Sequence, residues 1–343
     1  MYRSIRNNWF IRNWSSRVLF RTAVTLAVLV ILHTMLLYFE YSGLELSKWL
    51  LIWLNLLSEY AGVGIIALGM TFVIACGCID LSAGAMAAVL SSVTIRFADI
   101  GSTGIKQAAG LSGITAYIAA IFVCIILGAL MGQITGLLIT RLNAPSYVVT
   151  FGIMMIFSGL SDYLTADVSL VIRSGFMRIA LYKISGIVFL PVIYWLVLAI
   201  TLYILFRNTV FGKYVIAIGS SEKAARLAGI NVERIKRAVF MLAGMMTAVT
   251  AAVQAAASAA PDYTGLGSNC TTDAIAACVL GGARLDGGRG YVAGTVMGTL
   301  IIAIINNISG LTDISPYIRE ACKGVVIIGA IMLQKKNGRP QLT

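Results

Sequence analysis

Few side chains of this chain could do chemistry, and those few lie inside or beside long apolar runs. Asp80 follows one apolar run and begins a short one, and Asp273 stands in the same relation to a later run. Ionisable groups inside a membrane are costly, so each is a candidate for a transport path. Aspartate is also a favoured helix N-cap, and capping is the interpretation we favour for both carboxylates. The candidates for lining a path are Asp80, Ser82, Asp273, Asn306 and Asn307.

The two asparagines lie within one apolar run, and two further charges begin the last run. Asn306 and Asn307 could bond across helices or face a polar path, and the sequence favours neither. Glu320 and Lys323 are three residues apart, so they can pair on one helical face. For Lys323 we expect its ammonium group to reach toward the membrane surface.

Recognisable catalytic and nucleotide-binding patterns are missing from the sequence. The phosphate loop G-x-x-x-x-G-K-[ST] occurs nowhere, so the chain has no visible means of hydrolysing ATP. The glycine-rich stretch 287–290 lacks the Lys-[Ser/Thr] pair and reads as a turn. The single histidine, His33, lies in an apolar run, which leaves no histidine-based metal site or catalytic triad. We therefore expect no enzyme activity, metal or cofactor in this chain.

The composition shows what surrounds these residues. Of 343 residues, 59% are hydrophobic and only 12% are charged, and the mean hydropathy is +0.90. A globular domain carries about 25% charged residues, because its surface must meet water. The chain is therefore not an ordinary soluble enzyme, a disordered chain or a secreted disulfide scaffold. Its six cysteines lie in or beside apolar runs, where free cysteine behaves as a small buried hydrophobe.

The net charge of +12 could suggest a nucleic-acid partner, but the positions of the charges argue against one. Lysine and arginine form short clusters between apolar runs, without a basic stripe or a nucleic-acid-binding motif. Positive loops of this kind are typical of the cytoplasmic side of a membrane protein. We expect a multi-pass protein of the bacterial inner membrane, in contact with lipid, with both termini in the cytoplasm and no cleaved signal peptide.

The apolar runs predict an all-α protein with about ten transmembrane segments, two of them short or broken. The predicted segments are 23–39, 61–76, 83–95, 116–139, 146–164, 187–206, 238–260, 273–280, 291–311 and 318–333. The domain organisation is then a basic N-terminal segment (1–22), a transmembrane domain (23–334) with a cytoplasmic loop (207–237), and a cytoplasmic tail (335–343).

Glycine recurs at every fourth residue in two of these segments. Glycines so spaced lie on one helical face and let a second backbone approach closely, which favours helix packing. Each stripe also lies near a short segment flanked by glycine, at 77–82 and at 281–288, and paired interruptions of this kind point to a transport site. The stripes are Gly128, Gly132 and Gly136, and Gly290, Gly294 and Gly298.

The longest cytoplasmic loop is predicted to hold two helices. Ser221 can cap the first, Glu222 lies at its positive end, and Gly229 is suited to end it. Asn231 can cap the second, which runs into the membrane. Because Leu227 is the only large apolar side chain of the short first helix, we expect that helix to dock into a groove of a partner.

Five sequence patterns, in this order along the chain, carry a family resemblance. They are IALGMTFVI (66–74) with IDLSAG (79–84); Pro145 with VTFG (149–152); FGKY (211–214); AARLAGIN (224–231); and DAIAA (273–277) with LGG (280–282) and GGRG (287–290). With them the chain resembles the permease subunits of bacterial ABC sugar importers of the ribose type. Cys78, Thr135 and Ser146-Tyr147 depart from the usual residues of that family.

The resemblance implies a function and a set of partners. The chain would be the membrane subunit of an importer that moves a monosaccharide by alternating access. Its partners would be cytoplasmic ABC ATPase subunits, which bind ATP and Mg, a second permease chain, identical or related, and a periplasmic sugar-binding protein. The residues implied in coupling to the ATPase are Glu222, Ala224, Ala225, Arg226, Leu227 and Gly229. An ion-coupled transporter, or an ABC permease for a nucleoside or a signalling sugar, is the alternative.

Overall fold

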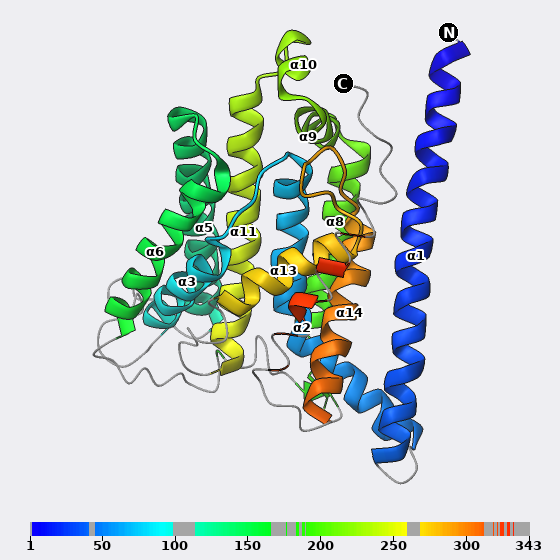
Figure 1. Ribbon diagram of the computed structural model, residues 1–343. Coiled ribbons are helices and arrows are strands. Elements are labelled where there is room, and N and C mark those ends of the chain that lie inside the picture. The colour runs from blue at the N-terminus through cyan, green and yellow to red at the C-terminus, as the bar shows by residue number, and fades with distance from the viewer. Residues whose placement is uncertain are drawn as a thin grey trace.

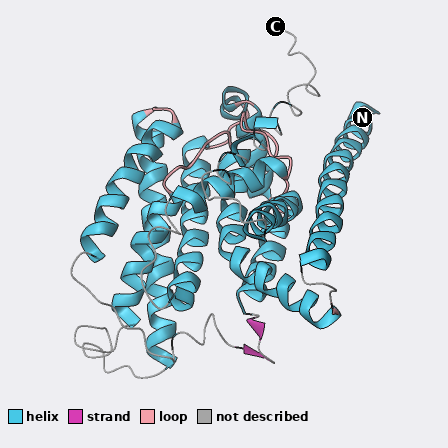
Figure 2. Ribbon diagram, turned by 60° about the horizontal axis from the view of Figure 1, so that its bottom comes forward, coloured by secondary structure: helices cyan, strands magenta, loops and turns pink. Residues whose placement is uncertain are grey.

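The fold was described from a computed structural model. It describes residues 2–40, 45–98, 114–165, 190–258 and 268–311, with short pieces at 176, 183–184, 187–188, 318, 321, 323–325, 328–329 and 332. The helices are α1 (Tyr2–Glu40), α2 (Leu46–Ala75), α3 (Ala83–Ala98), α5 (Ile114–Leu142), α6 (Ser146–Thr165), α8 (Leu190–Asn208), α9 (Val210–Ser220), α10 (Glu222–Leu227), α11 (Val232–Ser258), α13 (Ser268–Leu280) and α14 (Val292–Leu311). Strands β1 (Lys183–Ile184) and β2 (Ile187–Val188) pair antiparallel beside the bundle (Figure 2).

The helical class predicted from composition is confirmed for the described residues. Seven helices are long and apolar enough to cross a membrane, and three shorter apolar helices accompany them: Ala83–Ile95, Val210–Ser220 and Asn269–Leu280. Most of the predicted last segment, 318–333, lies outside the described residues, as does Glu320. The predicted N-terminal segment 1–22 continues without a break into the first apolar span, because α1 runs from Tyr2.

Several helix boundaries differ from those predicted by hydropathy. The predicted segment that begins at residue 61 is part of a longer helix of 30 residues, α2, which begins at Leu46. Helix α9 was not predicted, and Thr209 caps it by accepting a hydrogen bond from the Gly212 N–H at 3.4 Å. Helix α13 begins at Ser268, five residues before the predicted start. At α9 the boundary is set by this local cap, which hydropathy does not register.

Helices α2 and α11 form the centre of the bundle (Figure 1). Buried residues make up 72% of the apolar window in each, against 17% in α1 and in α6, so α1 and α6 lie at the periphery. Helix α11 packs on α5, α2 and α3, while α13 packs between α2 and α14. The five cysteines in the described part of the chain are free and buried, and all five lie within this core.

The two glycine stripes lie at helix–helix contacts. A Cβ at Gly128 would come within 2.5 Å of the Gly244 carbonyl oxygen on α11, and one at Gly136 within 2.8 Å of the Arg237 Cα. Gly132 between them faces the Phe240 carbonyl on the same helix. Helices α5 and α11 therefore touch backbone to backbone, as small residues allow in a membrane.

The second stripe joins α14 to two other elements. A Cβ at Gly298 would lie 2.9 Å from the Ala277 carbonyl carbon on α13, and Gly294 faces Gly281 at the end of that helix. Gly290 instead lies against α2, because a Cβ there would meet the Ala75 side chain at 3.0 Å. This stripe thus fixes α13 and α2 against the start of α14.

Candidate functional site

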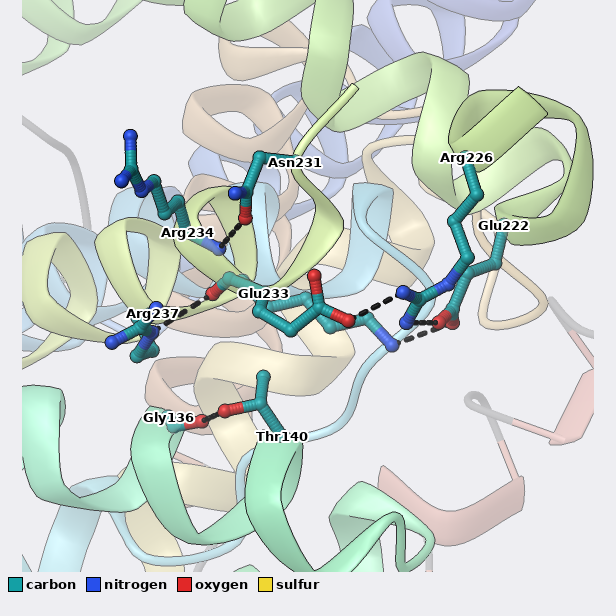
Figure 3. Close-up of polar contacts among 9 residues, drawn as sticks. Gly136, Thr140, Glu222, Arg226, Asn231, Glu233, Arg234 and Arg237 are labelled. Atoms are coloured by element: carbon teal, nitrogen blue, oxygen red, sulfur yellow. Dashed lines mark hydrogen bonds and ion pairs between the residues drawn. The ribbon is translucent and has the colours of Figure 1, made fainter. Parts of the chain in front are cut away.

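The surface helix α10 is built by local signals that the sequence analysis identified. The Ser221 hydroxyl accepts a hydrogen bond from the Ala224 N–H at 3.3 Å, which confirms the predicted cap. Gly229 ends the helix with φ of +80°, and the Ile230 N–H donates back to the Ala225 carbonyl at 3.0 Å. Asn231 then caps α11 by accepting from the Arg234 N–H at 3.0 Å (Figure 3). These closed ends hold a six-residue helix that is too short to be stable alone.

A charge network fastens α10 to the start of α11. The Glu222 carboxylate is 2.8 Å from the Arg226 guanidinium and 2.7 Å from the Lys236 ammonium (Figure 3). Arg226 also pairs with Glu233 on α11. Burial raises the pKa of Glu222, but hydrogen bonds from Lys236 and Arg226 outweigh it, so the net effect is to lower the pKa of Glu222. The carboxylate therefore stays charged at neutral pH and holds the two helices together.

The two faces of α10 differ in exposure. Leu227 is 83% exposed, whereas Ala225 is 4% exposed and packs toward the membrane domain. The sequence pattern of small and apolar residues at 224, 225, 227 and 228 predicts about one shared face, but Ala225 is buried while Leu227 is exposed, so Ala225 instead anchors the helix. A large apolar side chain held in water by a fixed helix suits contact with a partner.

A cavity of about 250 Å³ lies beneath this helix. Its walls come from the turn between α5 and α6, with Asn143 and Pro145, and from the charge network of α10 and α11. Asn143 has φ of +50°, a conformation that asparagine tolerates better than most residues. The cavity separates α10 from the α5–α6 turn, so α10 is fixed mainly through α9 and α11.

The loop between α2 and α3 is held by hydroxyl groups of neighbouring helices. The Asp80 carboxylate accepts from the Ser82 N–H at 2.8 Å and from its hydroxyl at 2.6 Å, and both residues are buried. Ser146 and Thr150 on α6 accept from the N–H groups of residues 79 and 81. Helix α3 starts at Ala83, so Asp80 lies in a turn before the helix. The prediction that Asp80 is the N-cap of α3 is therefore wrong.

The start of α3 is instead capped from another helix. The Thr271 hydroxyl on α13 accepts the Gly84 N–H at 2.7 Å. Sequence reasoning missed this bond because Thr271 was assigned to a loop. The bond joins two of the three shorter apolar helices, α3 and α13, near their N-terminal ends.

Asp273 is part of a buried polar cluster inside the bundle. It lies within α13, so the predicted capping role is wrong, because the helix begins at Ser268. Its carboxylate is 3.1 Å from the Lys323 ammonium, and both side chains are 9% exposed. The Asn306 amide nitrogen on α14 lies 3.4 Å from the same carboxylate. The expected reach of Lys323 to the membrane surface is also wrong, since a buried partner is closer.

The two adjacent asparagines of α14 face different neighbours. Asn306 turns toward Asp273, and its side-chain oxygen is buried without a hydrogen-bond partner in the described part of the chain. The Asn307 side-chain oxygen accepts a hydrogen bond of 2.8 Å from Nε2 of His33 on α1. Asn307 therefore ties the peripheral α1 to the core, and Asn306 belongs to the buried cluster.

These features define a multi-pass membrane protein with a packed helical core, a buried charged cluster and a short helix that exposes Leu227 on one face. The chain belongs to the family described as the permease component of branched-chain amino acid transport systems, which it matches over residues 52–331. That match includes α10 and the polar cluster.

Individual relatives cover most of the chain. It is 38% identical over 291 residues to the ribose import permease protein RbsC of Bacillus subtilis strain 168, which covers 83% of this chain and 84% of that protein. It is 32% identical over 295 residues to the galactose/methyl galactoside import permease protein MglC of Haemophilus influenzae, covering 81% and 84%. The xylose transport system permease protein XylH of Escherichia coli K12 is 30% identical over 346 residues, covering 83% and 85%. No solved structure matches.

Proposed function

We propose that this chain is the permease subunit of an ABC importer that carries a monosaccharide across the bacterial inner membrane by alternating access. The observation that carries this proposal is its similarity, over four fifths of the chain, to permeases named for ribose, galactose and xylose. The exposed Leu227 on a capped helix supports it, since such a helix can transmit movement from a partner.

The proposed assembly follows from the lack of a phosphate loop in the sequence. Cytoplasmic ATPase subunits bind ATP and Mg and dock on α10, where Glu222, Arg226 and Gly229 hold the helix and Ala224 and Leu227 face the partner. A second permease chain completes the path, and a periplasmic binding protein delivers the sugar. We place ten segments in the membrane within a domain of residues 23–334, with both termini in the cytoplasm and the tail at 335–343.

For the transport path we propose the region between the two short helices. Asp80 and Ser82 precede α3, while Asp273 on α13 lies beside Asn306 on α14. Buried ionisable residues inside a membrane default to functional roles, and polar side chains of these types can bond sugar hydroxyls. Asn307 bonds to His33, so its role in the path is limited to holding α14 in place.

An ion-coupled transporter would use a carboxylate that gains and loses a proton during transport. Asp273 instead lies 3.1 Å from the Lys323 ammonium, so a cationic side chain of the same chain already occupies this carboxylate. This pairing supports an ATP-driven importer over the ion-coupled alternative.

The test is reconstitution of the purified permease in liposomes with its ATPase and binding protein. We expect uptake of a monosaccharide that depends on ATP and on both partners, and no uptake by the permease alone under a proton or sodium gradient. Ribose, xylose, galactose, a nucleoside and leucine should be compared as substrates, because the family description names amino acids. Accumulation by the permease alone, driven by an ion gradient, would contradict the proposal.

A further inference from the structure

We propose that three glycine-containing segments form a junction that transmits the movement of α10 to both short helices, α3 and α13. The segments are 75–77 at the end of α2, 219–220 at the end of α9, and 287–288 in the turn before α14. This inference rests on the proposed function, because it assigns a route for the movement that the ATPase would drive.

Each loop of the junction is closed by its own hydrogen bonds. Two residues after α2, Gly77 has φ of +81°, and the Cys78 N–H donates back to the Val73 carbonyl at 3.0 Å. Helix α13 ends in the same way, since Gly282 has φ of +94° and the Ala283 N–H donates to the Cys278 carbonyl at 2.9 Å. Such closed helix ends are stiff, and each therefore moves with the helix that it terminates.

The following turn is closed as well. The Gly287 N–H donates to the Arg284 carbonyl at 2.9 Å, and the Arg284 N–H donates to the Arg289 carbonyl at 3.2 Å. Gly287 and Gly288 have φ of +86° and +73°, so side chains there would strain the turn. A push on this turn is thus passed to α13 on one side and to α14 on the other.

The three segments touch through their backbones. The Gly288 N–H donates to the Ala75 carbonyl at 2.9 Å, which joins the turn to α2. A Cβ at Gly219 would come within 2.5 Å of the Gly288 nitrogen. A Cβ at Gly287 would come within 2.7 Å of the Gly77 Cα and 2.8 Å of the Gly219 carbonyl oxygen. At these distances a displacement of one segment must displace the other two.

The junction lies directly next to α10 along the chain, so it can receive the movement of that helix. Gly219 and Ser220 end α9, and the next residue, Ser221, is the cap of α10. Glycine in a helix is conformationally costly relative to alanine, so its presence in the last turn of α9 is explained by the close approach. Movement of α10 therefore reaches the junction without passing through a flexible linker.

Both short helices lie directly beyond the junction. Loop 77–82 leads from it to α3, and the Thr271–Gly84 hydrogen bond of 2.7 Å joins α3 to α13. Packed interfaces of this kind have discrete arrangements and do not deform continuously. The junction would thus move Asp80 and Asp273, the carboxylates proposed for the path, in a single step.

The first experiment uses the complete transporter in liposomes with the substitution Gly219→Ala. We expect the complex to assemble and to hydrolyse ATP, while the amount of sugar taken up per ATP falls by about 5- to 150-fold, the range of typical coupling free energies. Gly159→Ala is the matched control, since a Cβ there meets nothing within 4 Å. Normal uptake per ATP by Gly219→Ala, or an equal loss of hydrolysis and uptake in an intact complex, would overturn the inference.

A second measurement does not depend on any variant. In the wild-type transporter, hydrogen exchange at residues 77–82 and 283–289 should change on ATP binding together with exchange at 221–227. A change confined to α10 would overturn the inference even if Gly219→Ala fails to fold. Failure of the proposed function is seen separately, as a wild-type complex without ATP-driven uptake.

Discussion

Leu227 is an exposed apolar side chain on a helix that ion pairs and the buried Ala225 hold in place. The ion pairs of Glu222 and Arg226 fix the helix, so the exposure of Leu227 at 83% is a property of the folded chain. Burying a leucine side chain contributes about 1.5–3 kcal/mol. A pocket on the ATPase would therefore gain a substantial part of its binding free energy from this one residue.

The substitution Leu227→Asp should leave the permease inserted and folded but weaken ATPase binding and abolish uptake. A carboxylate forced into an apolar pocket adds a desolvation cost of several kcal/mol unless it finds a partner. Leu227→Ala should have a smaller effect, and Lys213→Asp on α9 is the control for an added carboxylate. Co-purification of the ATPase and sugar uptake are the measurements. Retention of both by Leu227→Asp would show that α10 is only a linker.

A second prediction about individual residues concerns the ion pair between Asp273 and Lys323. Lys323→Met alone should destabilise the permease by about 3–5 kcal/mol, because it leaves a buried carboxylate without its charged partner. Asp273→Asn combined with Lys323→Met should recover most of that loss. Thermal unfolding of the purified permease in detergent checks both. Additive losses in the double variant would show that the two charges do not interact.

How far the residues could be predicted depends on whether their partners are local. The caps at Ser221 and Asn231 and the glycine at 229 were predicted because each acts within a few residues of its own helix. The pairing of Asp273 with Lys323 joins residues 50 apart, and no sequence pattern specifies it. The sequence favoured a position at the membrane surface for the Lys323 ammonium, because a charged residue at the start of an apolar run gives no sign of a buried partner on another helix.

At the scale of elements, the spacing of glycines predicted helix contacts better than hydropathy predicted helix boundaries. Hydropathy missed α9, whose first turn is capped locally by Thr209. It also misplaced the start of α13, where the Thr271 hydroxyl accepts the Gly84 N–H of α3. The four-residue spacing correctly indicated one face on α5, but the partner helix, α11, came only from the structure. A glycine stripe indicates that a second helix packs closely on that face, but it does not identify that helix.

The contact of α5 with α11 predicts the effect of filling it. Gly132→Ala would place a methyl group against the Phe240 carbonyl, and overpacking of a well-packed core costs about 1–3 kcal/mol. Gly152→Ala on α6 is the control, because its Cβ would meet nothing within 4 Å. The readout is the unfolding temperature of the permease in detergent, which should fall for Gly132→Ala only. Equal stability of the two variants would mean that α5 and α11 are not in close contact.

At the scale of the whole molecule, the positions of the helix ends indicate which end of the bundle faces the cytoplasm. Figure 1 shows the start of α1 at the end of the bundle that holds α10, together with the turn from α5 to α6 and the turn before α14. Exposed Arg141, Arg207, Lys213 and Lys223 lie at this same end, which the positive-inside rule assigns to the cytoplasm. Helix α14 then runs to the opposite end, so a tenth segment at 318–333 would return the C-terminus to the cytoplasm.

Cysteine labelling tests this topology in a variant without native cysteines. Single cysteines at Ser102 and Asp262 should react with a membrane-impermeant reagent in intact cells, because those positions follow segments that lead away from α10. Cysteines at Asn208, beside α9, and at Asn337, in the predicted tail, should react only after the membrane is opened. Asn208 is the internal control, since the structure places it at the α10 end. Labelling of Asn337 from outside, with Asn208 still protected, would remove the tenth segment and place the C-terminus in the periplasm.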